Sequence, residues 1–140
     1  MQPDRDFRLR IAHPDRDALA ALVPFAEAVY LHQVVIRRGA NLTRVLDLAQ
    51  ALASADPNDL GDEWRIHFHV PLFRASLGLF ASTQPFLAEL LALHRSAPFT
   101  DHLEVETYTW DVLPAELRGE PVADAIAREL RWTIDQLEAA

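Results

Sequence analysis

The sequence predicts an α/β fold in which four parallel strands alternate with helices. Stretches with the period-two pattern of a strand are followed, four times in succession, by stretches whose apolar residues recur every three or four positions. In addition, three of the strands carry histidine or glutamate side chains that would lie on one face of the sheet. Because 140 residues suit one hydrophobic core, we expect a single domain over residues 1–140.

The predicted strands cover residues 7–12, 29–36, 65–71 and 102–109. The first alternates apolar and basic residues, and the second is a run rich in β-branched residues that ends at Arg37-Arg38-Gly39. The third and fourth place two histidines and two glutamates, respectively, at alternate positions. Strands joined through helices in this way should be parallel neighbours with right-handed crossovers.

A helix is expected after each strand. The four helices should begin after Pro14-Asp15, cover residues 42–52, follow Ser82 or Thr83, and cover residues 122–137. Pro85 suits the first turn of the third helix, and His94-Arg95 suits the negative end of its dipole. The last helix has one apolar stripe along its length.

The polar face indicates how such a sheet would be closed. Helices on both sides of an open parallel sheet would require apolar residues on both faces, whereas the inner face of a barrel tolerates polar ones. The polar side chains concerned are His32, His67, His69, Glu104 and Glu106. We therefore expect a parallel (β/α)4 unit, half of a TIM barrel, completed either by a second copy in a homodimer or by a missing N-terminal half-barrel.

Composition excludes several classes of function. A net charge of -8 and a pI near 5.1 argue against nucleic acid and anionic membranes as partners. The chain has no cysteine, and all 13 of its basic residues are arginine, which excludes thiolate chemistry, lysine Schiff bases and a P-loop. With no apolar stretch long enough for a membrane span or a signal peptide, we expect a cytoplasmic protein.

Four segments together resemble the C-terminal half of the EboE family of "metabolite traffic" proteins. They are Tyr30-Leu31-His32-Gln33-Val34-Val35, His67-Phe68-His69-Val70-Pro71-Leu72-Phe73, Ser82-Thr83-Gln84-Pro85-Phe86-Leu87 and the run from His102 through Glu104-Val105-Glu106-Thr107-Tyr108-Thr109-Trp110 to Pro114. The resemblance runs nearly end to end. It implies strands five to eight of a xylose-isomerase-like TIM barrel, with strands one to four and their carboxylate ligand outside these 140 residues.

The resemblance also implies a divalent metal, Mn, Mg or Zn, and assigns its ligands. His69 or His67 matches the ligand on strand seven, Glu106 matches the ligand on strand eight, and His32 lies where a further ligand or a substrate contact is expected. With the metal held by His69, Glu106 and His32, the catalytic residues would be Glu104 and His67. The expected function is isomerisation or epimerisation of a small sugar, polyol or sugar-phosphate-like metabolite.

Three further residues are candidates for substrate binding. Trp110 and Tyr108 would stack on a sugar ring, and Arg37 would bind a phosphate, although all three also suit a core or a solvated strand end. The glutamates, for their part, have an alternative role as ion-pair partners of Arg8, Arg10 or Arg65. The alternatives to an enzyme are a non-catalytic protein that binds or hands on a metabolite, and an inactive truncated barrel.

Overall fold

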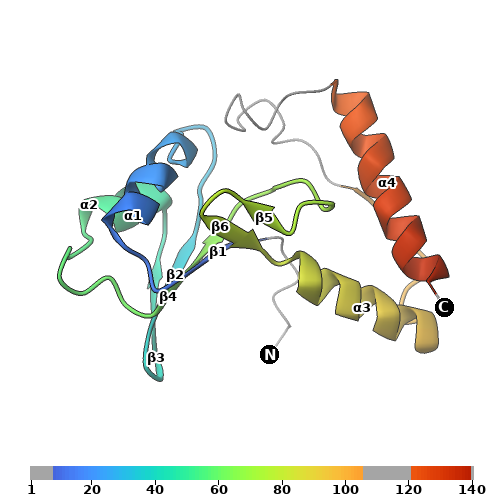
Figure 1. Ribbon diagram of the computed structural model, residues 1–140, viewed down its shortest axis with the longest axis horizontal. Helices are drawn as coiled ribbons and strands as arrows, with labels where there is room; N and C mark the ends of the chain where they lie inside the picture. The colour runs from blue at the N-terminus through green and yellow to red at the C-terminus, as the bar shows by residue number, and fades with distance from the viewer. Residues whose placement is uncertain (1–7, 106–120, 140) are drawn as a thin grey trace.

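The computed structural model describes residues 8–105 and 121–139. Its centre is a six-stranded antiparallel sheet with the strand order β3-β2-β4-β1-β6-β5 (Figure 1). The strands are β1 (Arg8–Ala12), β2 (Val34–Arg38), β3 (Asn41–Val45), β4 (Glu63–His67), β5 (Ser76–Leu77) and β6 (Phe80–Ser82). The helices are α1 (Arg16–Leu22), the short 3-10 helix η1 (Val23–Phe25), α2 (Leu48–Ala53), α3 (Gln84–Ser96) and α4 (Val122–Glu138).

The predicted parallel (β/α)4 half of a TIM barrel is wrong. β4 lies between β1 and β2 and is antiparallel to both, with Ile66 opposite Leu9 on one side and opposite Val34 on the other. β1 and β2 therefore run in the same direction, as their connection through α1 predicts, but they are not neighbours. The first βα unit is a split β-α-β arrangement into which the chain later inserts β4.

One face of the sheet forms the hydrophobic core. Leu9 and Ile11 of β1, Val34 and Ile36 of β2, and Trp64 and Ile66 of β4 are all buried on this face. Helices α1 and α2 lie against it (Figure 1). At one end of the core the ring of Phe25 makes T-shaped contacts with the rings of Phe68 and Phe80, whose centroids are 5.0 and 5.7 Å from its own.

The opposite face of the sheet, here called the open face, is polar. Arg10, Glu63 and Arg65 alternate with the core residues of β1 and β4, Arg37 does the same on β2, and Arg44 lies on the exposed edge strand β3. An antiparallel sheet can carry a polar face toward water without closing into a barrel. The polar residues at alternate positions of β1, β2 and β4 are explained in this way, and they do not require a closed barrel.

Glycine turns build the two hairpins that the sequence pattern did not predict. Gly39 has φ +57° between β2 and β3, and Gly78 has φ +63° between β5 and β6. Each is the first residue of a two-residue turn, the position where a type II′ hairpin requires glycine. Because the first hairpin continues through residues 41–45, the helix expected over 42–52 begins only at Leu48.

The predicted positions of the other helices are confirmed. The Asp15 side chain caps α1 by accepting a hydrogen bond of 2.8 Å from the backbone N–H of Ala18. Helix α3 begins after Thr83 with Pro85 in its first turn, and α4 covers the predicted residues. The strand expected over 102–109 is not formed by residues 102–105, and its remainder lies outside the described residues. None of the helices in the described ranges is long and apolar enough to cross a membrane.

Helices α3 and α4 lie side by side beyond the end of the sheet (Figure 1). Arg95 of α3 donates a hydrogen bond of 2.8 Å to the backbone carbonyl of Gln136 in α4. Glu129 of α4 is buried and accepts a hydrogen bond of 3.1 Å from the backbone N–H of Leu72, the loop residue whose carbonyl is bound by Gln84. Burial raises the pKa of Glu129, and the single bond from Leu72 does not offset it.

Substitution of Glu129 should therefore stabilise the protein at neutral pH. A carboxyl whose pKa is raised by folding stabilises the folded state only while it is protonated, so stability falls as the pH rises above the ordinary glutamate value. In Glu129→Gln the amide oxygen keeps the bond from Leu72 without a buried charge. Urea unfolding from pH 4 to 8 should show a variant that is about 1 kcal/mol more stable at pH 7 and less dependent on pH than wild type. A loss of stability at pH 7 would contradict this account of the site.

Gly61 precedes β4 at a point where the backbone of β2 approaches closely. It has φ +79°, and a Cβ atom would lie 2.8 Å from the Arg37 carbonyl oxygen and 3.0 Å from Ile36 Cγ2. Gly78 has a similar φ with nothing within 4 Å of its Cβ position. Gly61→Ala should cost about 3 kcal/mol of unfolding free energy, and the control Gly78→Ala about 1 kcal/mol. Equal losses in thermal or urea unfolding would mean that the close approach to β2 does not exist.

Candidate functional site

A groove of about 700 Å³ lies over the open face of the sheet. Strands β1 to β4 form its floor, and the end of β6 with the first turn of α3 borders it. Its lining residues are Arg10, Val35, Arg37, Leu42, Arg44, Glu63, Arg65, Ser82, Thr83, Pro85 and Phe86. Four of the 13 arginines of the chain are thus gathered on one surface.

The register of the sheet explains why these arginines are neighbours. Arg44 of β3 is opposite Val35 of β2, Val35 is opposite Arg65 of β4, and Arg65 is opposite Arg10 of β1. These four residues form one row across the sheet. In the next row, Arg37 of β2 lies opposite Glu63. Residues of both rows point to the same face because they are spaced by two along each strand.

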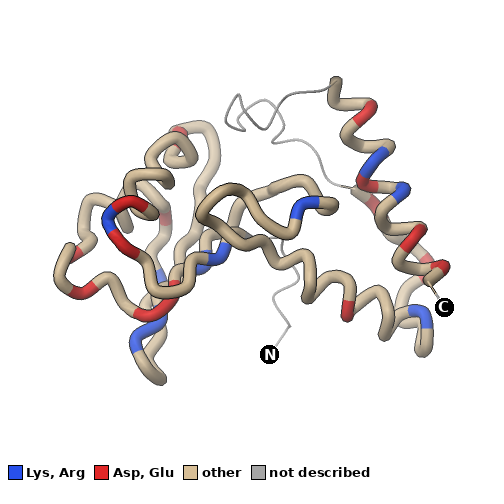
Figure 2. Tube along the Cα trace, viewed as in Figure 1, with Lys and Arg blue, Asp and Glu red and all other residues tan. Residues whose placement is uncertain are grey.

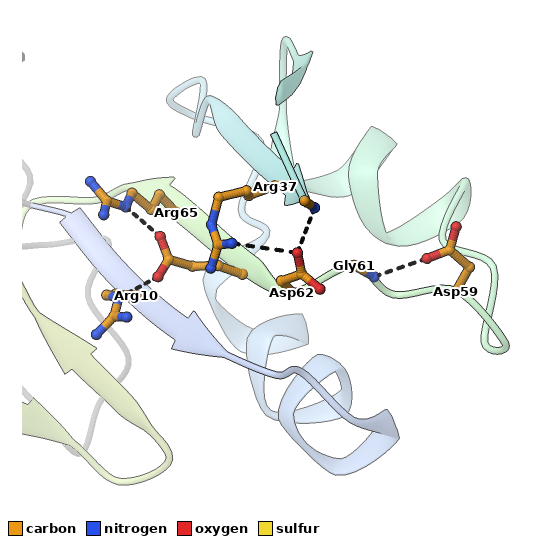
Figure 3. Close-up of polar contacts among 8 residues, drawn as sticks. Arg10, Arg37, Asp59, Gly61, Asp62 and Arg65 are labelled. Carbon is orange, nitrogen blue, oxygen red and sulfur yellow. Dashed lines mark hydrogen bonds and ion pairs between the residues drawn. The ribbon is translucent and has the colours of Figure 1, made fainter. Parts of the chain in front are cut away.

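Glu63 holds two of the arginines in place. Its carboxylate accepts a hydrogen bond of 2.6 Å from Arg10 Nε and one of 2.7 Å from Arg65 Nε, so that Arg10 and Arg65 flank it (Figure 3). Glu63 is 4% exposed, whereas both arginine side chains are about half exposed. Both guanidinium groups are engaged through Nε, and no other contact within the described residues occupies their terminal nitrogens.

The charge of Glu63 is stabilised by these contacts. Burial alone would raise the pKa of Glu63, but the hydrogen bonds and charges of Arg10 and Arg65 outweigh it and hold the pKa below the ordinary glutamate value. Glu63 is therefore ionised at neutral pH. It lowers the repulsion between the two arginines and fixes where their free donors lie.

Arg37 and Arg44 differ in their polar contacts. Arg37 Nη1 lies 3.4 Å from Asp62 Oδ2, and the same oxygen accepts a hydrogen bond of 2.6 Å from the backbone N–H of Gly39 (Figure 3). Arg44, on the edge strand β3, has no ion pair or hydrogen bond to any residue that the structure describes. Figure 2 shows basic positions along the strands of the sheet, with acidic positions in the loop before β4 and on α1.

The structure gives His32 a structural role. His32 is buried, its ring lies 4.4 Å from that of Phe68, and its two ring nitrogens lie 2.9 Å from Glu27 Oε1 and 3.3 Å from the His67 carbonyl oxygen. Burial would raise the pKa of Glu27, but bonds from the N–H groups of Val29 and Tyr30 and from His32 lower it. This contact network fastens the segment before β2 to the sheet.

The two histidines of the third predicted strand do lie together. The rings of His67 and His69 are stacked, with centroids 5.3 Å apart. Strand alternation puts His67 on the face opposite Phe68, and therefore on the side of the sheet away from the His32 ring. Among residues 8–105 and 121–139, no three histidine, aspartate or glutamate side chains are placed to hold a metal ion.

The remaining predicted site residues are Glu104, Glu106, Tyr108, Trp110 and Arg37. Glu104 is exposed and lies 3.5 Å from His102 Nε2, which is also exposed. Glu106, Tyr108 and Trp110 lie outside the described residues, so the expected metal and sugar-stacking contacts made through them stay predictions. Arg37, predicted as a phosphate contact, is the candidate that lies in the groove.

Sequence reasoning missed Glu63 and Arg44 as site residues. The signal was present in Glu63-Trp64-Arg65-Ile66-His67, where charged and apolar residues alternate, as they do in β1. The alternative role predicted for the glutamates paired Glu104 or Glu106 with Arg8, Arg10 or Arg65, whereas in the structure Arg10 and Arg65 pair with Glu63. Nothing in the local pattern identifies Arg44, because its neighbours depend on the register of the β2–β3 hairpin.

Comparison of the chain with protein-family models, with curated proteins and with solved structures finds no match. The antiparallel sheet corrects the expectation of a xylose-isomerase-like TIM barrel. The resemblance to the EboE family stays a prediction. The arginine-lined groove on the open face of the sheet is therefore the candidate site.

The Glu63 carboxylate should make the groove sensitive to acid. Because its pKa is lowered by folding, its stabilising effect is present above the ordinary glutamate value and is lost as the pH falls through the folded pKa. Glu63→Gln should cost about 1–2 kcal/mol at pH 7, a value reduced by the exposure of both arginines. The difference between wild type and variant in urea unfolding should shrink toward pH 3. A difference that is constant over this range would contradict the ion-pair account.

Proposed function

We propose that this chain is a non-catalytic binding protein for a small anionic metabolite of the sugar-phosphate or polyol-phosphate type, which occupies the groove on the open face. The observation that carries the proposal is the concentration of four arginines on one face of a chain with a net charge of -8. Such a surface attracts a small anion locally, although the chain as a whole repels extended polyanions.

The arginines suit phosphate or carboxylate in their geometry as well as in their charge. A guanidinium group offers donors in a planar fork that matches these anions, and charge-assisted hydrogen bonds of this kind are strong. The pairing with Glu63 holds Arg10 and Arg65 through Nε and leaves their terminal nitrogens for a ligand. Less conformational entropy is then lost when the ligand binds.

Apolar side chains in the same groove suit the carbon skeleton of such a ligand. Val35 and Leu42 belong to its floor, and Phe86 of α3 lies at its border and is 49% exposed. An aromatic ring and aliphatic groups beside polar donors are the usual composition of a small-molecule site.

The lining supports binding rather than proton-transfer chemistry. Among the described lining residues the only carboxylate is Glu63, which is bound by two arginines and has a lowered pKa, and none is a histidine. A general base at neutral pH requires an accessible group whose pKa lies near 7. The proposed role is accordingly to bind and release a metabolite.

Calorimetric titration with glucose 6-phosphate tests this function, with glucose as the uncharged probe. We expect saturable binding of glucose 6-phosphate, none of glucose, and about tenfold weaker phosphate binding in Arg65→Gln. Arg16→Gln, which makes the same charge change on α1 and outside the groove, should bind as wild type does. Absence of binding to wild type, or equal losses in the two variants, would overturn the proposal.

A further inference from the structure

We infer that the ligand carries a second acidic group at its far end and spans the groove from the Arg10–Arg65 pair to Arg44. This inference rests on the proposed function and names the class of metabolite more narrowly. It follows from the spacing of the arginines, from the net charge of the groove and from the lack of a polar partner for Arg44 among the described residues.

The spacing comes from the row of residues across the sheet. Arg44 and Arg65 are two strands apart with Val35 between them, and Arg10 is one strand further. With neighbouring strands about 4.8 Å apart, the backbones at Arg44 and Arg65 are separated by roughly 10 Å. A single phosphate bound at the pair would leave Arg44 to a different part of the ligand. An elongated ligand lying along the row would instead pass over Val35.

The charge of the groove fits two acidic groups. Its lining contains four arginines and Glu63, and Asp62 lies beside Arg37, so four positive charges less two negative ones leave +2. One of these charges belongs to the Arg10–Glu63–Arg65 group and the other to Arg44. The two centres of positive charge are therefore at separate places.

Arg44 is also available to a ligand. It is an exposed residue whose side chain lines the groove, and it has no polar partner within the described ranges. A different role for an arginine on an edge strand is to discourage pairing with the edges of other molecules. That role predicts that Arg44→Gln increases self-association without changing ligand selectivity, so the two can be separated by experiment.

The test compares two probes that share a phosphate and differ at the other end. 6-Phosphogluconate carries a terminal carboxylate that glucose 6-phosphate lacks. We expect wild type to bind 6-phosphogluconate about tenfold more tightly, and Arg44→Gln to bring the two dissociation constants within about twofold. Arg16→Gln is the matched control and should keep the wild-type ratio. Circular dichroism should show an unchanged fold for both exposed substitutions.

A second experiment tests whether tight binding depends on the length of the ligand or on its total charge. Succinate, adipate and suberate carry the same two carboxylates on chains of increasing length. If the acidic groups must reach both centres, suberate or adipate should bind more tightly than succinate, and Arg44→Gln should remove the difference. Equal affinities for the three acids, or a ratio for the phosphate probes that Arg44→Gln leaves unchanged, would overturn the inference. If glucose 6-phosphate itself binds in these experiments, the proposed function stands whatever the outcome for the second acidic group.

Discussion

The antiparallel pairing of β4 with both β1 and β2 is the constraint on which the rest of the structure depends. Because β4 is central, its alternation puts Trp64 and Ile66 into the core and Glu63 and Arg65 on the open face. A shift of one residue would reverse the two faces and bury charge. The same register brings Glu63 between two arginines, so one pairing determines both the core and the site.

The parts of the fold that could be predicted are those determined by residues that are close together in the sequence. The starts of α1 and α3 follow from a capping aspartate and from a proline in the first turn, and the first predicted strand, residues 7–12, corresponds to β1. The second and third predicted strands overlap β2 and β4 only at residues 34–36 and 65–67. The order of the strands could not be deduced, because a helix between two strands does not reveal that a third strand will later lie between them. Each hairpin has a glycine in its turn, in Gly39-Ala40 and Gly78-Leu79, which is typical of a tight turn between strands. The helical spacing of the apolar residues over 42–52, however, favours a helix where the first hairpin forms.

The residues of the candidate site could be predicted only in part. Polar residues at alternate positions of the strands indicate a polar face, and Arg37, predicted as a phosphate contact, lies in the groove on that face. The resemblance assigned the metal ligands to the ends of parallel barrel strands, and the antiparallel sheet does not provide that arrangement. His32 is instead part of the packing beneath the sheet, and Glu63 and Arg44 gain their neighbours only through the register.

The measurement that tests the account most directly is a nitrogen-15 NMR titration with glucose 6-phosphate that follows the Nε–H signals of the arginines. Binding in the groove predicts saturable shifts of the signals of Arg10 and Arg65, which Glu63 holds in place, while the signal of Arg16 on α1 stays unchanged. Assignment by single substitutions identifies each signal. Shifts confined to backbone signals of α3 and α4 or around His67 and His69, with the signals of Arg10 and Arg65 unmoved, would contradict the groove as the binding site.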